Sequence, residues 1–342
     1  MTILRVPVYQ KLVAFYKQKI NNQELPPNSK MDSIVRIMKR HNVSRDTAKR
    51  VQKELSEEGY IRKIIGKGTF VTSSTKVKKI WGMVIPFYSS NIEELIHNLK
   101  IEANQTGNEL IYFLTYNNPD EEKRLVAEMV MKGYEAVIVI PNYNETITAG
   151  FYQRLIPGNT TIVLVDNTMA GSYFKYVIQS YDLGVARALE YLTTQNNGNL
   201  LFVKNEDWQG RNLLYELMDK TFSSIVQAKH EPRISFSLQN ARELTYKFLI
   251  QNNIGGILCC TDIDSVRVLG RIKNWGIKIR HEISLVSYGN TELTEYFNPP
   301  ITSLDCQYSK MAAKTAELIQ KGKKSGLFEQ HIIHPKIIIR ET

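Results

Sequence analysis

The segment Val43-Ser44-Arg45-Asp46-Thr47-Ala48-Lys49-Arg50-Val51 predicts a helix with two distinct faces. Ser44 is a favourable N-cap, because its hydroxyl can accept hydrogen bonds from the free N–H groups of a first turn. Ala48, Val51 and Leu55 recur at helical spacing, so they can pack inward while the cations face outward. Such a face suits the phosphates and guanine edges of a DNA major groove. A basic amphipathic helix is more often an ordinary surface helix, so the flanking sequence must decide between that interpretation and DNA binding.

The flanking sequence predicts two more helices and a β-hairpin. Pro7 suits the start of a first helix, and Gly59 is placed to end the central helix as a left-handed C-cap. Lys67 stands between two glycines at the expected hairpin tip. The expected elements are helices 7–20, 33–41 and 44–59 and strands 61–65 and 69–72. This order is that of a winged helix-turn-helix.

Five motifs in order make residues 7–72 resemble the GntR-type winged helix-turn-helix of bacterial transcription regulators. They are Pro7-Val8-Tyr9, Leu25-Pro26-Pro27-Asn28, the segment from Val43, Glu58-Gly59-Tyr60-Ile61 and Gly66-Lys67-Gly68-Thr69-Phe70-Val71. One departure is Val35, which stands where the family has a DNA-contacting Arg, with Arg36 beside it. The resemblance implies DNA contacts by Ser33, Arg36, Ser44, Arg45, Thr47, Lys49, Arg50, Lys67 and Gly68.

Positive charge is concentrated at the same end of the chain. The 342 residues have a formal net charge of +10. Residues 1–79 hold 18 Lys and Arg against 6 Asp and Glu, a net of +12, whereas the remainder holds 26 against 28, a net of −2. This division predicts that the N-terminal part, and not the rest, binds a polyanion such as double-stranded DNA.

Other classes of protein are not expected. No run approaches the roughly 20 apolar residues of a membrane span, and no signal peptide is visible, so we expect a cytoplasmic, nucleoid-associated protein. The three cysteines and the histidines lack metal-ligand spacing, so we expect buried thiols, no metal and no cofactor. Nucleophile-elbow, P-loop and dinucleotide motifs are absent, so the chain is not expected to be an enzyme.

From residue 80 onward, apolar strands alternate with helices, which predicts an α/β fold with parallel sheets. The pattern restarts near residue 182, so two lobes of similar build are expected. The expected organisation is a winged helix-turn-helix at 1–74, a linker at 75–79 and a two-lobed domain at 80–342, with lobe one at 80–178 and 308–325 and lobe two at 182–304 and 330–342. We expect hinges near 179–181 and 304–307, where the chain passes between lobes.

Residues 80–342 resemble the effector domain of the lactose-repressor type, akin to periplasmic ribose-binding proteins. The resemblance is carried by 80–86, Val165-Asp166-Asn167, Asp182-Leu183-Gly184, Thr261-Asp262, 283–290 and Pro299-Pro300-Ile301-Thr302-Ser303. Behind a GntR-type module, this looks like the arabinose-repressor-like branch of GntR regulators. The resemblance implies a homodimer that represses a carbohydrate-utilisation operon and leaves its operator when a monosaccharide binds.

Candidate effector contacts lie after the expected strands, because ligands of open α/β sheets bind beyond the carboxyl ends of the strands. Aromatic faces beside carboxylates, amides and an Arg suit a sugar. The candidates are Phe87, Tyr88, Ser90, Tyr116, Asp166, Asp207, Trp208, Arg211, Asp262 and Asn290. The resemblance gives Arg211 a pocket position and Asp262 a hydroxyl-binding role.

Plainer interpretations stand beside these. Arg211 could cap a helix or pair with Asp207, Asp262 could simply cap the following helix, and Phe87 and Tyr88 could pack a lid. The expected effector is an aldopentose or a 6-deoxyhexose, such as arabinose or fucose. The alternative is a purine or other small metabolite, and a remote alternative is an enzyme fused to a DNA-binding module.

Overall fold

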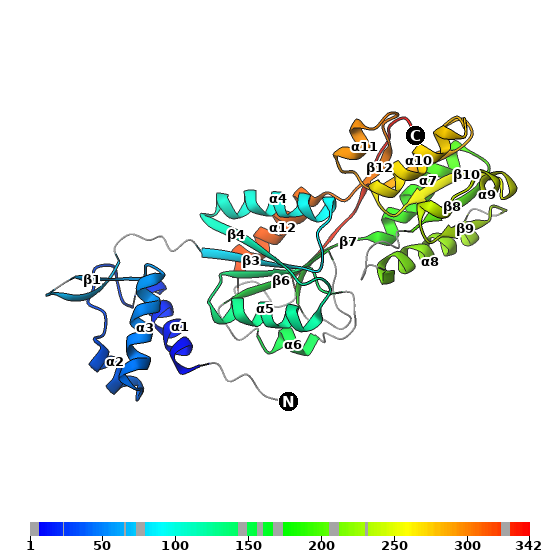
Figure 1. The fold of residues 1–342 in the computed structure, drawn as a ribbon. Coiled ribbons are helices and arrows are strands. Elements are labelled where there is room, and N and C mark those ends of the chain that lie inside the picture. The colour runs from blue at the N-terminus through cyan, green and yellow to red at the C-terminus, as the bar shows by residue number, and fades with distance from the viewer. Residues whose placement is uncertain are drawn as a thin grey trace.

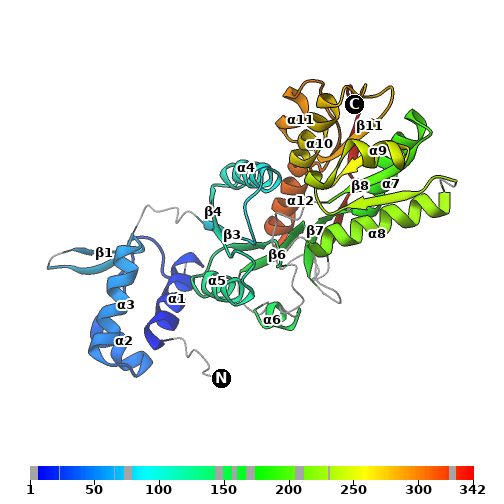
Figure 2. The ribbon, with the colours of Figure 1, turned by 45° about the vertical axis from the view of Figure 1, so that its right-hand side comes forward.

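The computed structural model describes residues 7–22, 24–64, 66–72, 79–142, 149–155, 160–166, 174–204, 212–229, 232–322 and 329–342. Figures 1 and 2 show a small helical module at one end, a first sheet with its helices in the middle and a second sheet at the other end. Within the described residues, no helix is both long and apolar enough to cross a bilayer.

The N-terminal module packs three helices under a β-hairpin. Its elements are α1 Val8–Asn21, α2 Ile34–His41, α3 Arg45–Glu57, β1 Ile61–Ile64 and β2 Gly68–Val71. The two strands pair antiparallel. Leu12, Tyr16 and Ile37 meet Val51 and Leu55 in one apolar core. The predicted order of helices and strands is therefore confirmed, and the core uses the face of α3 that the apolar spacing indicated.

The first sheet has six parallel strands in the order β13-β7-β6-β5-β3-β4. Its helices α4 and α12 cover one face, and α5 and α6 cover the other (Figure 1). The bounds are β3 Lys79–Ile85, α4 Ser90–Gln105, β4 Asn108–Leu114, α5 Pro119–Met131, β5 Ala136–Val139, α6 Ala149–Gln153, β6 Thr161–Asp166, β7 Lys175–Gln179, α12 Tyr308–Lys321 and β13 Gln330–Ile333. Burial on both faces explains the uninterrupted apolar strands.

The second sheet repeats this topology in the order β14-β12-β11-β10-β8-β9. Only its edge strand β14 is antiparallel. The bounds are α7 Tyr181–Gln195, β8 Asn199–Val203, α8 Asn212–Lys229, β9 Ser235–Leu238, η1 Ala241–Glu243, α9 Tyr246–Gln251, β10 Ile254–Cys259, α10 Asp262–Asn274, β11 Ser284–Gly289, α11 Glu292–Tyr296, β12 Thr302–Asp305 and β14 Lys336–Ile338. In each sheet, the strand that comes first in the sequence has the second strand on one side and the third strand on the other. The strand order therefore reverses between β3 and β5 in the first sheet and between β8 and β10 in the second.

Two details differ from the expected elements. The alternating pattern of the second lobe predicts one helix over 241–252, but the segment is broken into η1 and α9, because Thr245 caps a new helix by accepting a hydrogen bond from the Phe248 N–H. The segment 330–333, expected in lobe two, instead forms β13 beside β7 of the first sheet. A short apolar strand suits either sheet edge, so its sequence alone did not choose between them.

The chain therefore crosses between the lobes three times, not at the two expected hinges alone. The crossings lie between β7 and α7, between β12 and α12, and between β13 and β14. They are bonded to one another, because the Ser180 N–H donates to the Ile333 carbonyl at 2.9 Å and the Gln307 side chain donates to the His334 carbonyl. A hinge motion must bend all three crossings together.

Candidate functional site

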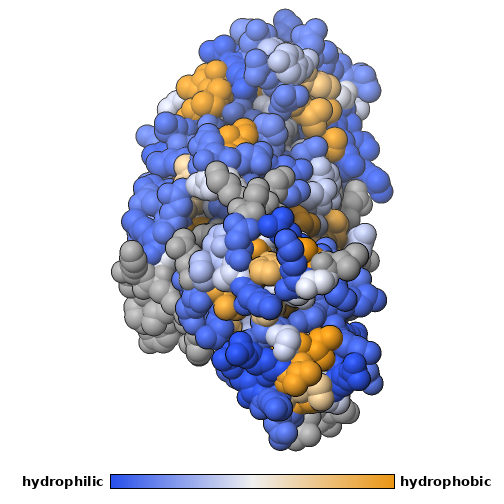
Figure 3. Space-filling model, turned by 90° about the vertical axis from the view of Figure 1, so that its left-hand side faces the viewer, coloured by the Kyte–Doolittle hydropathy of each residue, from blue (hydrophilic) through white to orange (hydrophobic). Residues whose placement is uncertain are grey.

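The N-terminus of α3 is built as its sequence predicts. The Ser44 hydroxyl accepts a hydrogen bond from the Thr47 N–H at 3.2 Å and lies 2.9 Å from the Thr47 hydroxyl. Ala48, Val51 and Leu55 are fully buried. Arg45 and Lys49 lie on the exposed face. The face of the molecule seen in Figure 3 is largely hydrophilic. The helix thus presents free cations on a rigid support.

The Arg50 side chain is bound by two neighbouring residues of the N-terminal module. Its guanidinium donates to the Tyr9 hydroxyl at 2.9 Å, lies 3.7 Å from the centre of the Tyr9 ring and pairs with Glu54 at 3.5 Å. A cation that stacks on an aromatic ring is less free to reach a phosphate. Arg50 is therefore a poorer DNA-contact candidate than Arg45 or Lys49.

The second helix carries the other two candidates from this region. The Ser33 hydroxyl caps α2 by accepting a hydrogen bond from the Arg36 N–H at 3.2 Å. The Arg36 side chain is 72% exposed and lies 3.8 Å from Asp32. Val35, where the resembled family has Arg, is also exposed.

Asp32 is a residue whose role the sequence did not reveal. Its carboxylate is nearly buried and accepts hydrogen bonds from the Tyr16 hydroxyl at 2.8 Å and from Arg40 at 2.5 Å. Its backbone carbonyl accepts one from the Gln52 side chain at 2.8 Å. Asp32 therefore ties α1, α2 and α3 together. The pKa of Tyr16 is raised, first by burial of its ring and then by its hydrogen bond to the Asp32 carboxylate.

The hairpin tip lies at the exposed edge of the module. Lys67 is exposed in the turn, and its N–H donates to the Ile64 carbonyl at 3.1 Å. Gly68 has φ +114°, a conformation that side chains rarely adopt, so a glycine is needed there. The tip therefore offers one unobstructed cation to a groove or phosphate.

The second candidate site is the interlobe junction, which we define as residues 86–91, 140–142, 204, 260–262 and 289–291. The junction residues follow the strands at which the strand order reverses, or lie beside those strands. In open α/β sheets, ligands bind at such places. The first turn of α4 reaches the second lobe here. A Cβ added to Gly289 would lie 3.0 Å from Asn91 Oδ1 and 2.6 Å from Asp262 Oδ2.

Asp262 lies at this junction, 2% exposed, and its carboxylate accepts four hydrogen bonds from the second lobe. The donors are the Ser287 hydroxyl, the Thr291 N–H at 2.7 Å, the Asn290 N–H at 3.3 Å and the Ser303 hydroxyl at 3.3 Å. The N-cap of α10 is Thr261, so the simple capping interpretation of Asp262 is wrong. Its effector role stays a prediction.

Asp166 and Asn290 are also engaged within the chain. Asp166 is 2% exposed and accepts hydrogen bonds from the Tyr181 hydroxyl at 3.0 Å and the Gln179 amide at 3.5 Å, which joins β6 to the first crossing. The Asn290 amide oxygen accepts one from Arg340 at 2.8 Å. Both side chains are positioned beside the junction by neighbours that the sequence did not indicate.

The aromatic candidates differ in how far they are exposed. Phe87 is 8% exposed and belongs to the apolar core, as the packing alternative suggested. Tyr88 is 40% exposed and stacks against Tyr112 of β4 at 6.4 Å. Tyr116 is 81% exposed after the edge strand β4, so within the described residues it packs against little. Ser90 is exposed in the first turn of α4, where Ser89 is the cap.

Three candidates, Asp207, Trp208 and Arg211, lie outside the described residues. Their effector roles stay predictions.

Sequence reasoning missed Lys204 in the interlobe junction and Glu94 beside it. Glu94 is half-buried one turn into α4, and burial, then the charges of Asp305, Asp262 and Glu292, raise its pKa to about 7. Lys204, 5% exposed at the end of β8, pairs with Glu216 at 2.8 Å and Asp219 at 3.2 Å. The helical spacing of Asn91 and Glu94 was the available signal for a polar face on α4.

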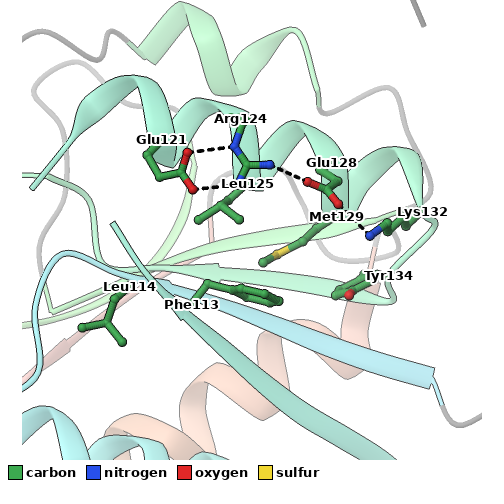
Figure 4. Close-up of a pocket in the computed structure, with 9 residues that line it drawn as sticks. All are labelled: Phe113, Leu114, Glu121, Arg124, Leu125, Glu128, Met129, Lys132 and Tyr134. Carbon is green, nitrogen blue, oxygen red and sulfur yellow. Dashed lines mark hydrogen bonds and ion pairs between the residues drawn. The ribbon is translucent and has the colours of Figure 1, made fainter. Parts of the chain in front are cut away.

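A pocket of about 260 Å³ lies on the outer side of the first lobe, between α5 and the edge strand β4 (Figure 4). Its charged groups satisfy one another, because Arg124 bonds Glu121 at 2.6 Å and Glu128 at 2.9 Å, and Lys132 bonds Glu128 at 2.6 Å. It lies apart from the interlobe junction, so it is not the effector candidate.

One group in the described residues has the geometry of a metal site. Ligand atoms of Glu317, Glu329 and His331 lie within 4.8 Å of one another. Lys321 already lies 2.7 Å from Glu317 and 2.5 Å from Glu329, and hydrogen bonds from Lys314 and Lys321 lower the pKa of Glu317 to about 2. This group is an ion-pair cluster between α12 and β13, so it carries no metal assignment.

Comparisons with known proteins agree with this architecture. Residues 207–342 match the family model of a periplasmic binding protein-like domain. An arabinose metabolism transcriptional repressor of Halalkalibacterium halodurans is 24% identical over 96% of this chain and 95% of its own. An HTH-type transcriptional repressor, PurR, of Histophilus somni is 21% identical over 90% of this chain and 92% of its own.

Solved structures show the same fold. A periplasmic binding protein/LacI transcriptional regulator from Alkaliphilus metalliredigens, complexed with D-xylulofuranose, is 20% identical with a TM-score of 0.63, covering 77% of this chain and 98% of that one. The lac repressor dimer bound to operator and the anti-inducer ONPF is 14% identical with a TM-score of 0.64, covering 86% and 97%.

These matches carry LacI-type and repressor names, so the GntR-type resemblance of residues 7–72 stays a proposal. Residues 207–342 are thus similar to a periplasmic binding protein-like domain, the two-lobed part of the chain has the fold of LacI-type regulators, and the similar proteins are named transcriptional repressors.

Proposed function

We propose that this chain is a DNA-binding transcriptional repressor that a monosaccharide releases from its operator. The observation that carries the proposal is the combination in one chain of a capped helix with exposed cations, α3, and a two-lobed periplasmic-binding-protein-like domain. Repressor relatives that cover nearly the whole chain support it. It acts in the cytoplasm and has no catalytic role.

The DNA-binding part is residues 1–74, a winged helix-turn-helix of the GntR type, with a linker at 75–79. Its support is the order α1-α2-α3 followed by the β1/β2 hairpin, together with the net charge of +12 over residues 1–79. One module covers half a site, so the chain acts as a homodimer on a near-palindromic operator. The lac repressor structure matched above is a dimer on its operator.

Replacement of Arg45 by alanine is expected to weaken operator binding by about 1–3 kcal/mol, roughly 5- to 150-fold, and to relax one base position. The reason is that Arg45 is exposed in the first turn of α3, where a recognition helix contacts bases. The measurement is a gel-shift titration on an operator selected in vitro and on single-base variants of it.

Two variants control that experiment. Arg154→Ala removes the same charge from an exposed position in the first lobe and should leave affinity within about twofold, because salt screens distant charges. Arg50→Ala should cost less than Arg45→Ala, because Arg50 is held by Tyr9 and Glu54. Unchanged operator affinity in Arg45→Ala would mean that α3 is not the reading helix.

The effector class can be decided directly. An aldopentose or 6-deoxyhexose is favoured by the arabinose-repressor relatives, whereas the relatives named PurR favour testing a purine as the second class. A ligand at a hundred times its Kd stabilises the native state by about 2.7 kcal/mol, which raises the unfolding midpoint by several degrees. We expect this shift with arabinose or fucose and none with purines. Stabilisation by purines alone would replace the sugar proposal.

A further inference from the structure

Glu122 of α5 is a carboxylate that neither DNA binding nor the effector candidates use. Its side chain is 0% exposed, beside the apolar cluster that includes Val84, Leu125 and Val139. It accepts a hydrogen bond from the Asn142 N–H at 2.9 Å and another from the Tyr152 hydroxyl. A fully buried carboxyl on an otherwise ordinary amphipathic helix is costly, so its two partners are informative.

Those partners lead to the place where strand order reverses in the first lobe. Asn142 follows β5, which lies next to β3 in the sheet, and so belongs to the interlobe junction. Tyr152 lies in α6 and is itself fully buried. Glu122 thus joins α5, α6 and the chain that leaves β5. This position lies just behind the edge where an effector of the first lobe would bind.

The charge on Glu122 is poorly compensated. Burial, opposed by hydrogen bonds from Tyr152 and Asn142, raises its pKa to about 7. The charge of Lys123, on the same helix, lowers the pKa of Glu122, but Lys123 also pairs with Asp120 at 3.4 Å. Glu121 on the same helix is paired with Arg124. Strands β3 and β5 beneath α5 contribute only apolar side chains to the shared cluster, and Tyr152 is the titratable group from α6.

We propose that Glu122 is a positioning residue of the effector site, whose carboxyl ties the chain after β5 to α5 and α6, and that ionisation of this fully buried carboxyl favours release of the tie, because the charge gains hydration when the region opens. The positioning role rests on the proposed effector function, whereas the release does not. Opening of this region lets water reach Glu122, where its pKa returns toward the ordinary value near 4.5. The opened form therefore binds fewer protons, and opening is favoured as pH rises.

The release is tested by hydrogen exchange of the full chain, followed in peptides that end at Asn142. With pKa values of about 7 closed and about 4.5 open, protection factors should fall about tenfold between pH 6 and pH 8. Glu122→Gln should keep protection high and independent of pH in this range. The matched control is Glu121→Gln, one residue earlier and half-exposed, which should behave like the parent chain. A pH-independent parent, or a pH-dependent Glu122→Gln variant, overturns the release.

The positioning role is tested by calorimetry at pH 6 with arabinose and fucose. Glu122→Leu leaves the Asn142 N–H without its acceptor and should weaken sugar binding about tenfold or more. Glu122→Gln keeps an acceptor and should bind within about twofold of the parent. Equal affinity in Glu122→Leu overturns positioning. If no sugar binds the parent chain, the effector proposal fails, while hydrogen exchange still decides whether Glu122 controls the chain after β5.

Discussion

Replacement of Asp262 by alanine is expected to lower the free energy of unfolding of the second lobe by about 3–5 kcal/mol. The carboxylate is 2% exposed and holds two backbone N–H groups, of Asn290 and Thr291, and two hydroxyls, of Ser287 and Ser303. Alanine leaves the Thr291 N–H and the Ser287 hydroxyl without this buried acceptor, whereas the Asn290 N–H still donates to the Ser303 hydroxyl at 3.0 Å and the Ser303 hydroxyl to the Ser287 carbonyl at 3.3 Å. The loss comes from their desolvation more than from any single bond.

Urea unfolding of the full chain, followed by fluorescence and circular dichroism, measures this loss. Asp262→Asn keeps one carbonyl acceptor and should cost roughly half as much. Asp120→Ala is the exposed control: its side chain is 90% exposed, and the change should cost under about 1 kcal/mol. If Asp262→Ala unfolded like the parent, the four bonds would contribute nothing to the lobe, and Asp262 would be free to serve an effector alone.

Replacement of Asp32 by alanine is expected to weaken operator binding strongly at 37 °C, because it unfolds part of the N-terminal module. The change removes the carboxylate that accepts hydrogen bonds from Tyr16, fully buried in α1, and from Arg40 in α2, and leaves the Tyr16 hydroxyl only His41 Nε2 at 3.2 Å, at a cost of about 2–4 kcal/mol. A module of some 65 residues has a stability of only about 3–10 kcal/mol, so this loss is a large fraction of the total. The measurement is operator affinity at 15 °C and at 37 °C.

The temperature comparison separates stability from contact. Asp32→Ala should bind operator at 15 °C better than at 37 °C, because the module is lost by unfolding and not by loss of a DNA contact. Tyr16→Phe removes one hydroxyl and should cost only about 1 kcal/mol. Equal weakening of Asp32→Ala binding at both temperatures, with normal thermal unfolding, would place Asp32 in the DNA interface instead.

Local sequence determined the elements of the N-terminal module. Ser44 caps its helix as predicted, and Ser33 caps α2 in the same way, because a capping hydroxyl needs only the backbone three residues ahead. The apolar spacing of Ala48, Val51 and Leu55 placed the buried face of α3 correctly for the same reason. Continuous apolar strands also indicated two covered parallel sheets, since such strands are buried on both faces.

Tertiary structure decided what those elements do to one another. Arg50 looked as free as Arg45 until Tyr9, 41 residues away, was seen to hold its guanidinium. The four residues of β13 did not determine which of the two sheets the strand joins; the tertiary structure places it at the edge beside β7. The roles of Asp32, Glu122 and Asp262 arise from donors 8 to 41 residues distant. A buried carboxylate is tolerated only where the fold brings donors to it, so the sequence by itself determined the elements and the fold alone assigned the carboxylates their partners.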